Sequence, residues 1–200
     1  MVLDDFFLEE NVSYEVLITT CSGSGPNTKP FGIRIRNVDE VILKLYNNNT
    51  LKNITSSDEF LIQFTQDPLV YTKALFDKLT GEDYLPDNIL RTATTTIKAQ
   101  KQDMNPTTIK NQYGQSQLTI IKAKITRIQQ HNTQIPVISR STNKIIELLV
   151  KISRINMMTK EETEQLKKEI KKESKFIIKE GNQKHIDSLT LINSQMKKYL

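Results

Sequence analysis

The 200-residue chain contains no tryptophan, one cysteine, two histidines, six glycines and six prolines. The single cysteine, Cys21, excludes an internal disulfide and a metal site built from clustered cysteines. His131 and His185 lie far apart and lack the spacing of paired metal ligands, so we expect no metal site. The chemistry of this protein must therefore come from other side chains or from a bound organic group.

Several patterns that define other protein classes are also missing. No apolar run approaches the roughly 20 residues that a membrane-spanning helix requires. The segment MVLDDFFLEE at the start is acidic and has no basic stretch of the kind that begins a secretory signal. No serine has a histidine and an acid at the spacing of a hydrolase triad, and no Gly-Lys-Ser/Thr sequence follows SGSGPN, as a phosphate loop would need. The simplest interpretation is a cytoplasmic protein.

The formal net charge of +5 conceals an uneven distribution along the chain. Residues 1–86 carry 7 basic and 13 acidic side chains, residues 87–150 carry 9 and 3, and residues 151–200 carry 12 and 7. An acidic first part is unfavourable for nucleic-acid binding, which depends on neutralising phosphates. The basic remainder is typical of solvated helix surfaces, so we expect neither nucleic acid nor a membrane as a partner.

Alternating apolar residues predict a β-rich first part. Strands are expected over five segments, namely 14–20, 31–36, 40–46, 59–65 and 118–128. Glycine, proline, asparagine and serine predict a turn over 21–29, and polar composition predicts a surface loop over 102–117.

Two short helices should interrupt these strands. The first should start at Asn49 or Thr50, either of which can act as its N-cap. The second should open at Asp67-Pro68, because aspartate caps well and proline suits the first helical position, and it should run to about Gly81.

From Ser139 onward the pattern is helical throughout. Thr159 and Glu162 have the spacing of a capping box, and Gly181 should end the helix that they begin. Apolar residues at helical spacing predict three buried faces, namely Ile145, Leu148, Leu149, Ile152 and Ile155, then Leu166, Ile170 and Ile177, then Ile186, Leu189, Ile192 and Met196. We expect a β domain over 1–136 and a helical subdomain over 137–200, packed on the first domain or on a partner.

The strongest functional signal comes from two polar segments of the first part. TTCSGSGPNTKPFGI (19–33) joins a strand end to the start of the next strand, and NNNTLKNI (47–54) places small polar side chains before a short helix. A helix N-terminus offers unpaired N–H groups and the positive end of the helix dipole, so a phosphate can bind there without a dedicated lysine or arginine. The two segments predict a pocket for a phosphorylated ligand with an aromatic ring.

The order of these motifs resembles a known family. TTxxxxGPNxxPxGI, followed by NTxxNI, an EFLI strand and DPLxxxKA, resembles the flavin-reductase-like FMN-binding split barrels, and more narrowly an archaeal branch of unknown function with a C-terminal helical region. The resemblance is strongest over residues 12–80. It implies an α+β fold with an antiparallel six-stranded split β-barrel and a C-terminal helical subdomain, in a homodimer that holds FMN at its interface.

The resemblance also implies which residues contact the FMN. Those along the ring and the ribityl chain would be Thr19, Thr20, Asn27, Pro30, Gly32 and Ile33. The family's Asp-Thr-x-x-Asn-Ile segment would lie at the phosphate, and here it supplies Asn49, Thr50 and Asn53. Because residues 1–86 are net negative, phosphate binding must depend on local donors, and Lys73 is a further candidate.

Three functions are compatible with this sequence. The first is an FMN-dependent oxidoreductase that passes hydride or electrons to an unknown substrate, in which the cofactor carries the reaction and no side chain stands out as an acid or a base. The second is a non-catalytic FMN carrier or redox sensor. The third is a β-barrel adaptor that binds a protein or RNA through its basic helices, without flavin.

Overall fold

The computed structural model describes residues 6, 8–23, 25–111, 114–131 and 139–199. The chain divides into two compact units, one of Met1–Thr65 with Thr80–Gln134 and the other of Gln66–Leu79 with Ile135–Leu200. The expected boundary after residue 136 falls within 132–138, outside the described residues. Residues 66–79 belong to the second unit, although the predicted β domain over 1–136 includes them.

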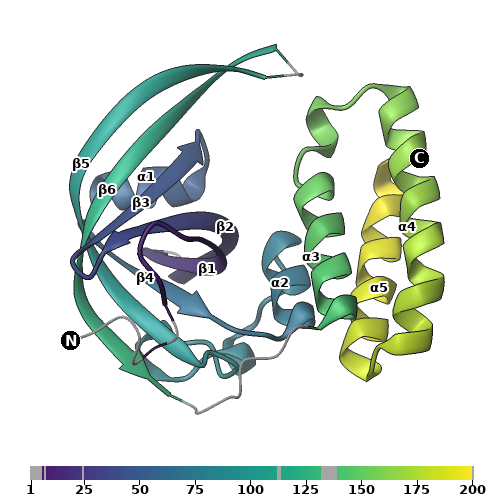
Figure 1. Cartoon of the computed structure of the whole chain (residues 1–200), viewed down its shortest axis with the longest axis horizontal. Helices are drawn as coiled ribbons and strands as arrows, with labels where there is room; N and C mark the ends of the chain where they lie inside the picture. Colours follow the sequence, from purple (N-terminus) through teal and green to yellow (C-terminus); the bar gives the residue numbers. More distant parts are fainter. Residues whose placement is uncertain (1–5, 7, 24, 112–113, 132–138, 200) are drawn as a thin grey trace. The chain divides into compact units, whose positions relative to one another are not determined.

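Six antiparallel strands of the first unit form a closed barrel in the order β1-β2-β3-β6-β5-β4 (Figure 1). Their bounds are Ser13–Ser22 for β1, Gly25–Asn37 for β2, Glu40–Tyr46 for β3, Glu59–Phe64 for β4, Thr95–Asn111 for β5 and Gly114–Gln130 for β6. Alternate residues such as Val16 and Ile18 of β1 and Ile62 of β4 fill the hydrophobic core. The predicted six-stranded barrel with C-terminal helices is confirmed.

The turn between β1 and β2 is much shorter than predicted. β1 continues to Ser22 and β2 begins at Gly25, which has a φ of +106°, so most of the predicted turn over 21–29 is strand. The reason is pairing across the two strands, where Thr19 lies opposite Thr28 and the two hydroxyls share a hydrogen bond of 2.7 Å. This pairing brings polar residues of the predicted turn into the barrel wall.

A long hairpin of β5 and β6 replaces the predicted loop over 102–117, so that prediction is wrong. The two strands pair along their length, whereas β4 pairs only with residues Thr95 to Gln100 of β5. Figure 1 shows both strands continuing together past the rest of the barrel. Pro106 is tolerated in this extension because proline, which lacks an N–H group, is acceptable in an edge strand. The hairpin escaped detection because its outer part carries polar residues on both faces.

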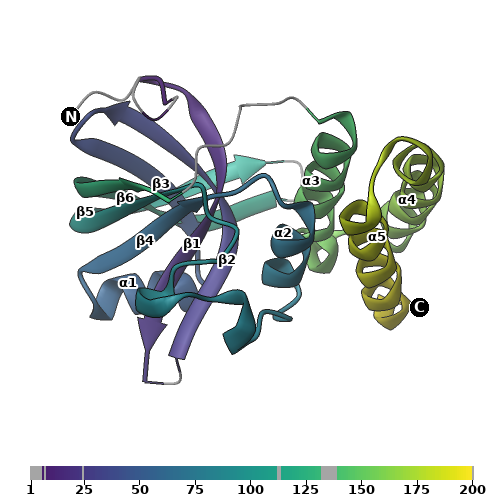
Figure 2. The same cartoon turned by 90° about the horizontal axis from the view of Figure 1, so that it is seen from below.

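In its described residues, the second unit contains the α-helices α2 (Pro68–Leu75), α3 (Arg140–Ile152), α4 (Lys160–Glu180) and α5 (Gln183–Met196). Helix α3 packs against α4 and α5, and α2 lies beside α3 and α5 (Figure 2). Helix α2 ends before the predicted position near Gly81, because Asp77 adopts a φ of +56° and the Lys78 N–H bonds to the Lys73 carbonyl at 2.8 Å. This arrangement is a Schellman-type helix end.

The helical pattern of the second unit is confirmed in detail. Thr159 accepts a hydrogen bond from the Glu162 N–H at 3.1 Å, and the Glu162 carboxylate accepts one from the Thr159 N–H at 2.8 Å, so the capping box is present. The predicted apolar faces are buried except at Ile186, which is half-buried. The buried side of α5 also contains His185.

Among the described helices, none combines the length and the apolar character needed to cross a membrane.

Neighbouring isoleucines on α4 give a matched test of this core. Ile177 is completely buried, whereas Ile178 is 58% exposed. We expect Ile177→Ala to lower the free energy of unfolding by about 2–5 kcal/mol, because it leaves a cavity. Ile178→Ala should change it by less than about 0.5 kcal/mol. Urea denaturation followed by circular dichroism measures both, and equal losses would contradict the assigned faces.

Candidate functional site

The structure brings the two polar segments together in one hydrogen-bonded cluster. The Thr20 hydroxyl of β1 accepts a hydrogen bond from the Asn53 amide at 2.9 Å and another from the Asn27 amide at 3.3 Å. The Asn27 amide also donates to the Thr50 hydroxyl at 2.9 Å. Thr20 and Thr50 are buried, and both asparagines are half-buried. Residues that are far apart in sequence thus form a polar cluster, which we call the Thr20 cluster.

Helix α1 (Asn49–Ser56) begins at the Thr20 cluster. Its N-cap is Asn48, one residue before Asn49 and two before Thr50, the two predicted positions, and the Asn48 side chain accepts a hydrogen bond from the Leu51 N–H at 2.9 Å. Asn49 is exposed in the first turn, which contains no acidic residue. A helix start with an exposed first residue and no neighbouring carboxylate in its first turn is suited to an anion.

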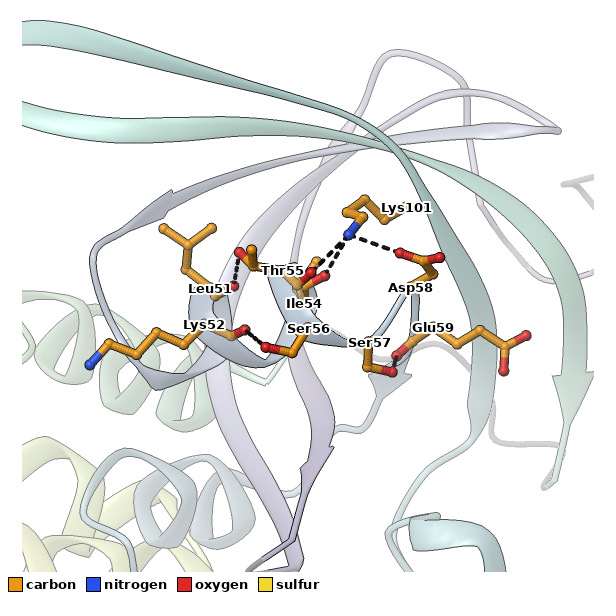
Figure 3. A network of polar contacts seen from close by, with 9 residues as sticks. All are labelled: Leu51, Lys52, Ile54, Thr55, Ser56, Ser57, Asp58, Glu59 and Lys101. Atoms are coloured by element: carbon orange, nitrogen blue, oxygen red, sulfur yellow. Dashed lines mark hydrogen bonds and ion pairs between the residues drawn. The ribbon is translucent and has the colours of Figure 1, made fainter.

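The other end of α1 is held by Lys101 of β5. Figure 3 shows the ammonium group of Lys101 between the end of the helix and Asp58. It donates to the carbonyls of Ile54 and Thr55, each at 3.1 Å, and forms an ion pair of 2.8 Å with Asp58. These contacts satisfy carbonyls that the last helical turn leaves without partners and complement the negative end of the dipole. Helix α1 is therefore fixed to the barrel at both ends.

Thr19 belongs to a second network on the other face of β1, because successive side chains of a strand alternate. Its hydroxyl shares a hydrogen bond of 2.7 Å with Thr28 and accepts another from the Gln63 amide at 2.7 Å. The Tyr84 hydroxyl donates to Thr28 at 2.8 Å. The two consecutive threonines, expected to act together along one ligand, thus serve different networks.

Sequence reasoning missed Tyr84 and Gln63. A tyrosine is already protonated near neutral pH, and burial raises the pKa of Tyr84 further. Gln63 is completely buried and also accepts a hydrogen bond from the Leu90 N–H at 2.8 Å. A glutamine in the apolar strand EFLIQF was the available signal, because a buried amide needs several partners.

Pro30 and Gly32 lie on β2 on the same face as Thr19 and Thr28, which is the outer face of the barrel. Gly32 is exposed, and a Cβ atom at this position would meet only Glu15 Oε1, at an ordinary distance of 3.5 Å. Packing within the chain therefore does not require glycine here, and a glycine in a strand often marks the close approach of a ligand or another backbone. Ile33 is buried in the barrel core, so its side chain is committed to packing.

The remaining candidate, Lys73, lies on α2 and belongs to the helical unit. Within the described ranges, no three side chains from histidine, cysteine, aspartate and glutamate gather in an arrangement that could hold a metal ion.

Two family models match this chain. The N-terminal domain model of a protein of unknown function, DUF447, matches residues 14–132. A second DUF447 model matches residues 139–194. The two models divide the chain between β6 and α3, close to the boundary between the barrel and the C-terminal helices.

Solved structures with a similar fold include an FMN-bound DUF447 protein from Methanosarcina mazei. That protein is 17% identical, has a TM-score of 0.78, and the match covers 96% of this chain and 98% of the other. A 2-nitrobenzoate 2-nitroreductase from Pseudomonas fluorescens is 12% identical, with a TM-score of 0.43 and coverage of 58% and 64%. A flavin reductase homologue from Haemophilus somnus is also 12% identical, with a TM-score of 0.43 and coverage of 62% and 84%. At these identities, the first match shows a shared fold.

The contacts of Lys101 predict a measurable role in holding α1. Lys101→Met should lower the free energy of unfolding by about 1–3 kcal/mol, because carbonyls lose a charged hydrogen-bond donor. Lys122→Met is the matched control, since Lys122 is an exposed lysine on the adjacent strand β6. Urea denaturation should place the Lys101→Met midpoint below that of the control, and identical midpoints would contradict this role.

Proposed function

Because the chain belongs to the DUF447 family of proteins of unknown function, we propose that it is an FMN-binding flavoprotein, and that it acts as an oxidoreductase. The observation that carries the proposal is the Thr20 cluster, which joins both predicted ligand segments at the start of α1. The FMN-bound state of the Methanosarcina mazei protein, which has the same fold over nearly its whole length, supports the choice of ligand.

The residues at the start of α1 fit a phosphate. The first turn offers backbone N–H groups and the Asn49 side chain, and it contains no carboxylate that would repel a dianion. Thr50 and Asn53 are held in place by Asn27 and Thr20, so they are ordered before any ligand arrives. These residues would hold the phosphate of FMN.

The outer face of β2 fits the flat part of the ligand. Gly32 is exposed and has no side chain that would obstruct a flat ring, and Pro30 lies two residues away on the same face of β2. When bound, the flavin would supply the redox chemistry, and the protein would orient it and control access to it. Tyr84 and Gln63 fix the hydroxyls of Thr28 and Thr19 beside this face, so these groups need no reorganisation when a ligand binds.

Removing two polar side chains at the start of α1 tests the phosphate site. Thr50→Ala combined with Asn53→Ala should weaken FMN binding about tenfold or more, which corresponds to about 1.4 kcal/mol, because the phosphate loses hydrogen-bond donors. Quenching of flavin fluorescence measures the affinity.

Two controls accompany this measurement. Riboflavin, which has no phosphate, should bind the double variant as it binds the parent. Thr55→Ala combined with Ser56→Ala, which removes two exposed hydroxyls at the other end of α1, should leave FMN affinity unchanged. Equal FMN affinity of the Thr50 and Asn53 double variant and the parent would contradict a phosphate site at the start of α1. A parent chain that binds no FMN at all would reject the proposed function.

The oxidoreductase role has its own test. The FMN-loaded protein is mixed with NADH or NADPH without oxygen, and the loss of the yellow flavin absorbance is followed. We expect reduction much faster than that of free FMN under the same conditions, because the bound ring is oriented for transfer. Reduction no faster than for free FMN with either donor would favour a carrier or a sensor instead.

A further inference from the structure

The barrel unit contains a cavity of about 410 Å³ that the proposed flavin contacts do not account for. Its lining comes from β1, β4, β5 and β6, from Ser57 before β4 and from the loop segment Asp87 to Ile89. Of the residues proposed to contact FMN, only Thr19 belongs to this lining. A volume of this size suits a small organic molecule.

The cavity floor includes a row of cross-strand partners. Thr19 lies opposite Leu61, Leu61 opposite Lys98, and Lys98 opposite Arg127. Adjacent strands are about 4.8 Å apart, so the two cationic side chains start from neighbouring positions on one face. Both can therefore reach a single ligand in the cavity.

The two cations differ in their partners. Lys98 forms an ion pair of 2.8 Å with Glu59. Among the residues that the structure describes, Arg127 forms no ion pair, and a guanidinium group matches the planar donor pattern of a carboxylate or a phosphate. Asp87, the other acid of the lining, lies on the loop, so it favours placement of an anionic group on the strand side of the cavity.

The loop wall of the cavity is strained and held in place. Asp87 and Asn88 have φ values of +62° and +60°, which residues other than glycine seldom adopt. The Asn88 carbonyl accepts a hydrogen bond from the buried Gln63 amide at 3.1 Å, and the Asn88 amide donates to Cys21 Sγ at 3.1 Å. Backbone strain maintained by surrounding contacts is concentrated at functional sites, and this strain supports a role for the cavity.

A histidine lies at the edge of the cavity. His131 Nε2 is 2.9 Å from the hydroxyl of Thr96, which lines the cavity. Burial lowers the pKa of His131, and the charge of Arg127 lowers it further. An anion bound at Arg127 should therefore change the electrostatic environment of the His131 ring, which makes this ring a suitable reporter.

We propose that the cavity binds a small molecule that carries a carboxylate or a phosphate, with the Arg127 guanidinium as its main contact and Asn88, Thr96 and Gln129 as neutral partners. The ligand is distinct from FMN and lies next to the proposed flavin face, because Thr19 belongs to both. Its role as the substrate or electron donor rests on the proposed function, whereas its binding does not.

Nuclear magnetic resonance of the two histidines tests this proposal. Inorganic phosphate and, separately, succinate are titrated into the full chain at pH 7 as probes of the two anion types. Saturable shifts of the His131 ring signals are expected, because an anion on Arg127 removes part of the charge that acts on His131. His185, which lies on α5 of the helical unit, should not respond and serves as an internal control.

Two variants decide whether Arg127 is the contact. Arg127→Gln should weaken the binding of the responding probe at least tenfold. Arg36→Gln should bind it like the parent, since Arg36 is an exposed residue of β2 outside the lining. The absence of a saturable His131 shift with both probes, or an equal response of Arg127→Gln and the parent, would overturn the proposal.

Repeating the titration with FMN-loaded protein separates the two proposals. A His131 response to the probe that persists with FMN bound supports a second ligand. If FMN blocks the probe and Arg127→Gln weakens FMN binding, the cavity holds part of the flavin itself, and the second ligand is rejected while flavin binding stands. If the probe binds but FMN does not, the anion site stands and the proposed function fails.

Discussion

The Thr20 hydroxyl is the contact on which the candidate site depends. It accepts hydrogen bonds from Asn27 of β2 and from Asn53 of α1, so one buried atom links two strands and a helix. Each such bond contributes only about 1 kcal/mol of net stability, but a buried donor left without a partner costs about 1–3 kcal/mol. A position of α1 that separated Asn53 from Thr20 would lose this bond, so the cluster favours the observed position.

Helix α1 is held by neutral hydrogen bonds at its start and by a charged side chain at its end. The Thr20 cluster holds its start through neutral hydrogen bonds, and Lys101 holds its end through a charge that complements the dipole. The positive charge of Lys101 lies at the C-terminal end of α1, which favours a cation, and the N-terminal end keeps its electrostatic preference for an anion. The same short helix thus provides both structural attachment and a candidate phosphate site.

Gln63 connects the proposed flavin face with the cavity beside it. Its amide nitrogen donates both to the Thr19 hydroxyl and to the Asn88 carbonyl, and its oxygen accepts from the Leu90 N–H. All three partners lie in or next to segments that a ligand would contact. A movement of the loop at Asn88 would break the Gln63–Asn88 bond, which is made by the same amide nitrogen that donates to Thr19.

The sequence by itself determined what depends on local periodicity and on short-range capping. The three helical faces after Ser139, the Thr159 capping box and most strands follow from spacing alone, because burial of one face imposes a period of 3.6 or 2. The two polar segments were also recognisable as ligand-binding candidates.

Only the tertiary structure decided which partners these residues have. The long β5–β6 hairpin has polar residues on both faces, Thr19 and Thr20 serve opposite sides of one strand, and Tyr84, Gln63 and Arg127 come from segments far apart in the chain. Such contacts depend on strand register and barrel closure, which are set by long-range pairing and leave no local signal.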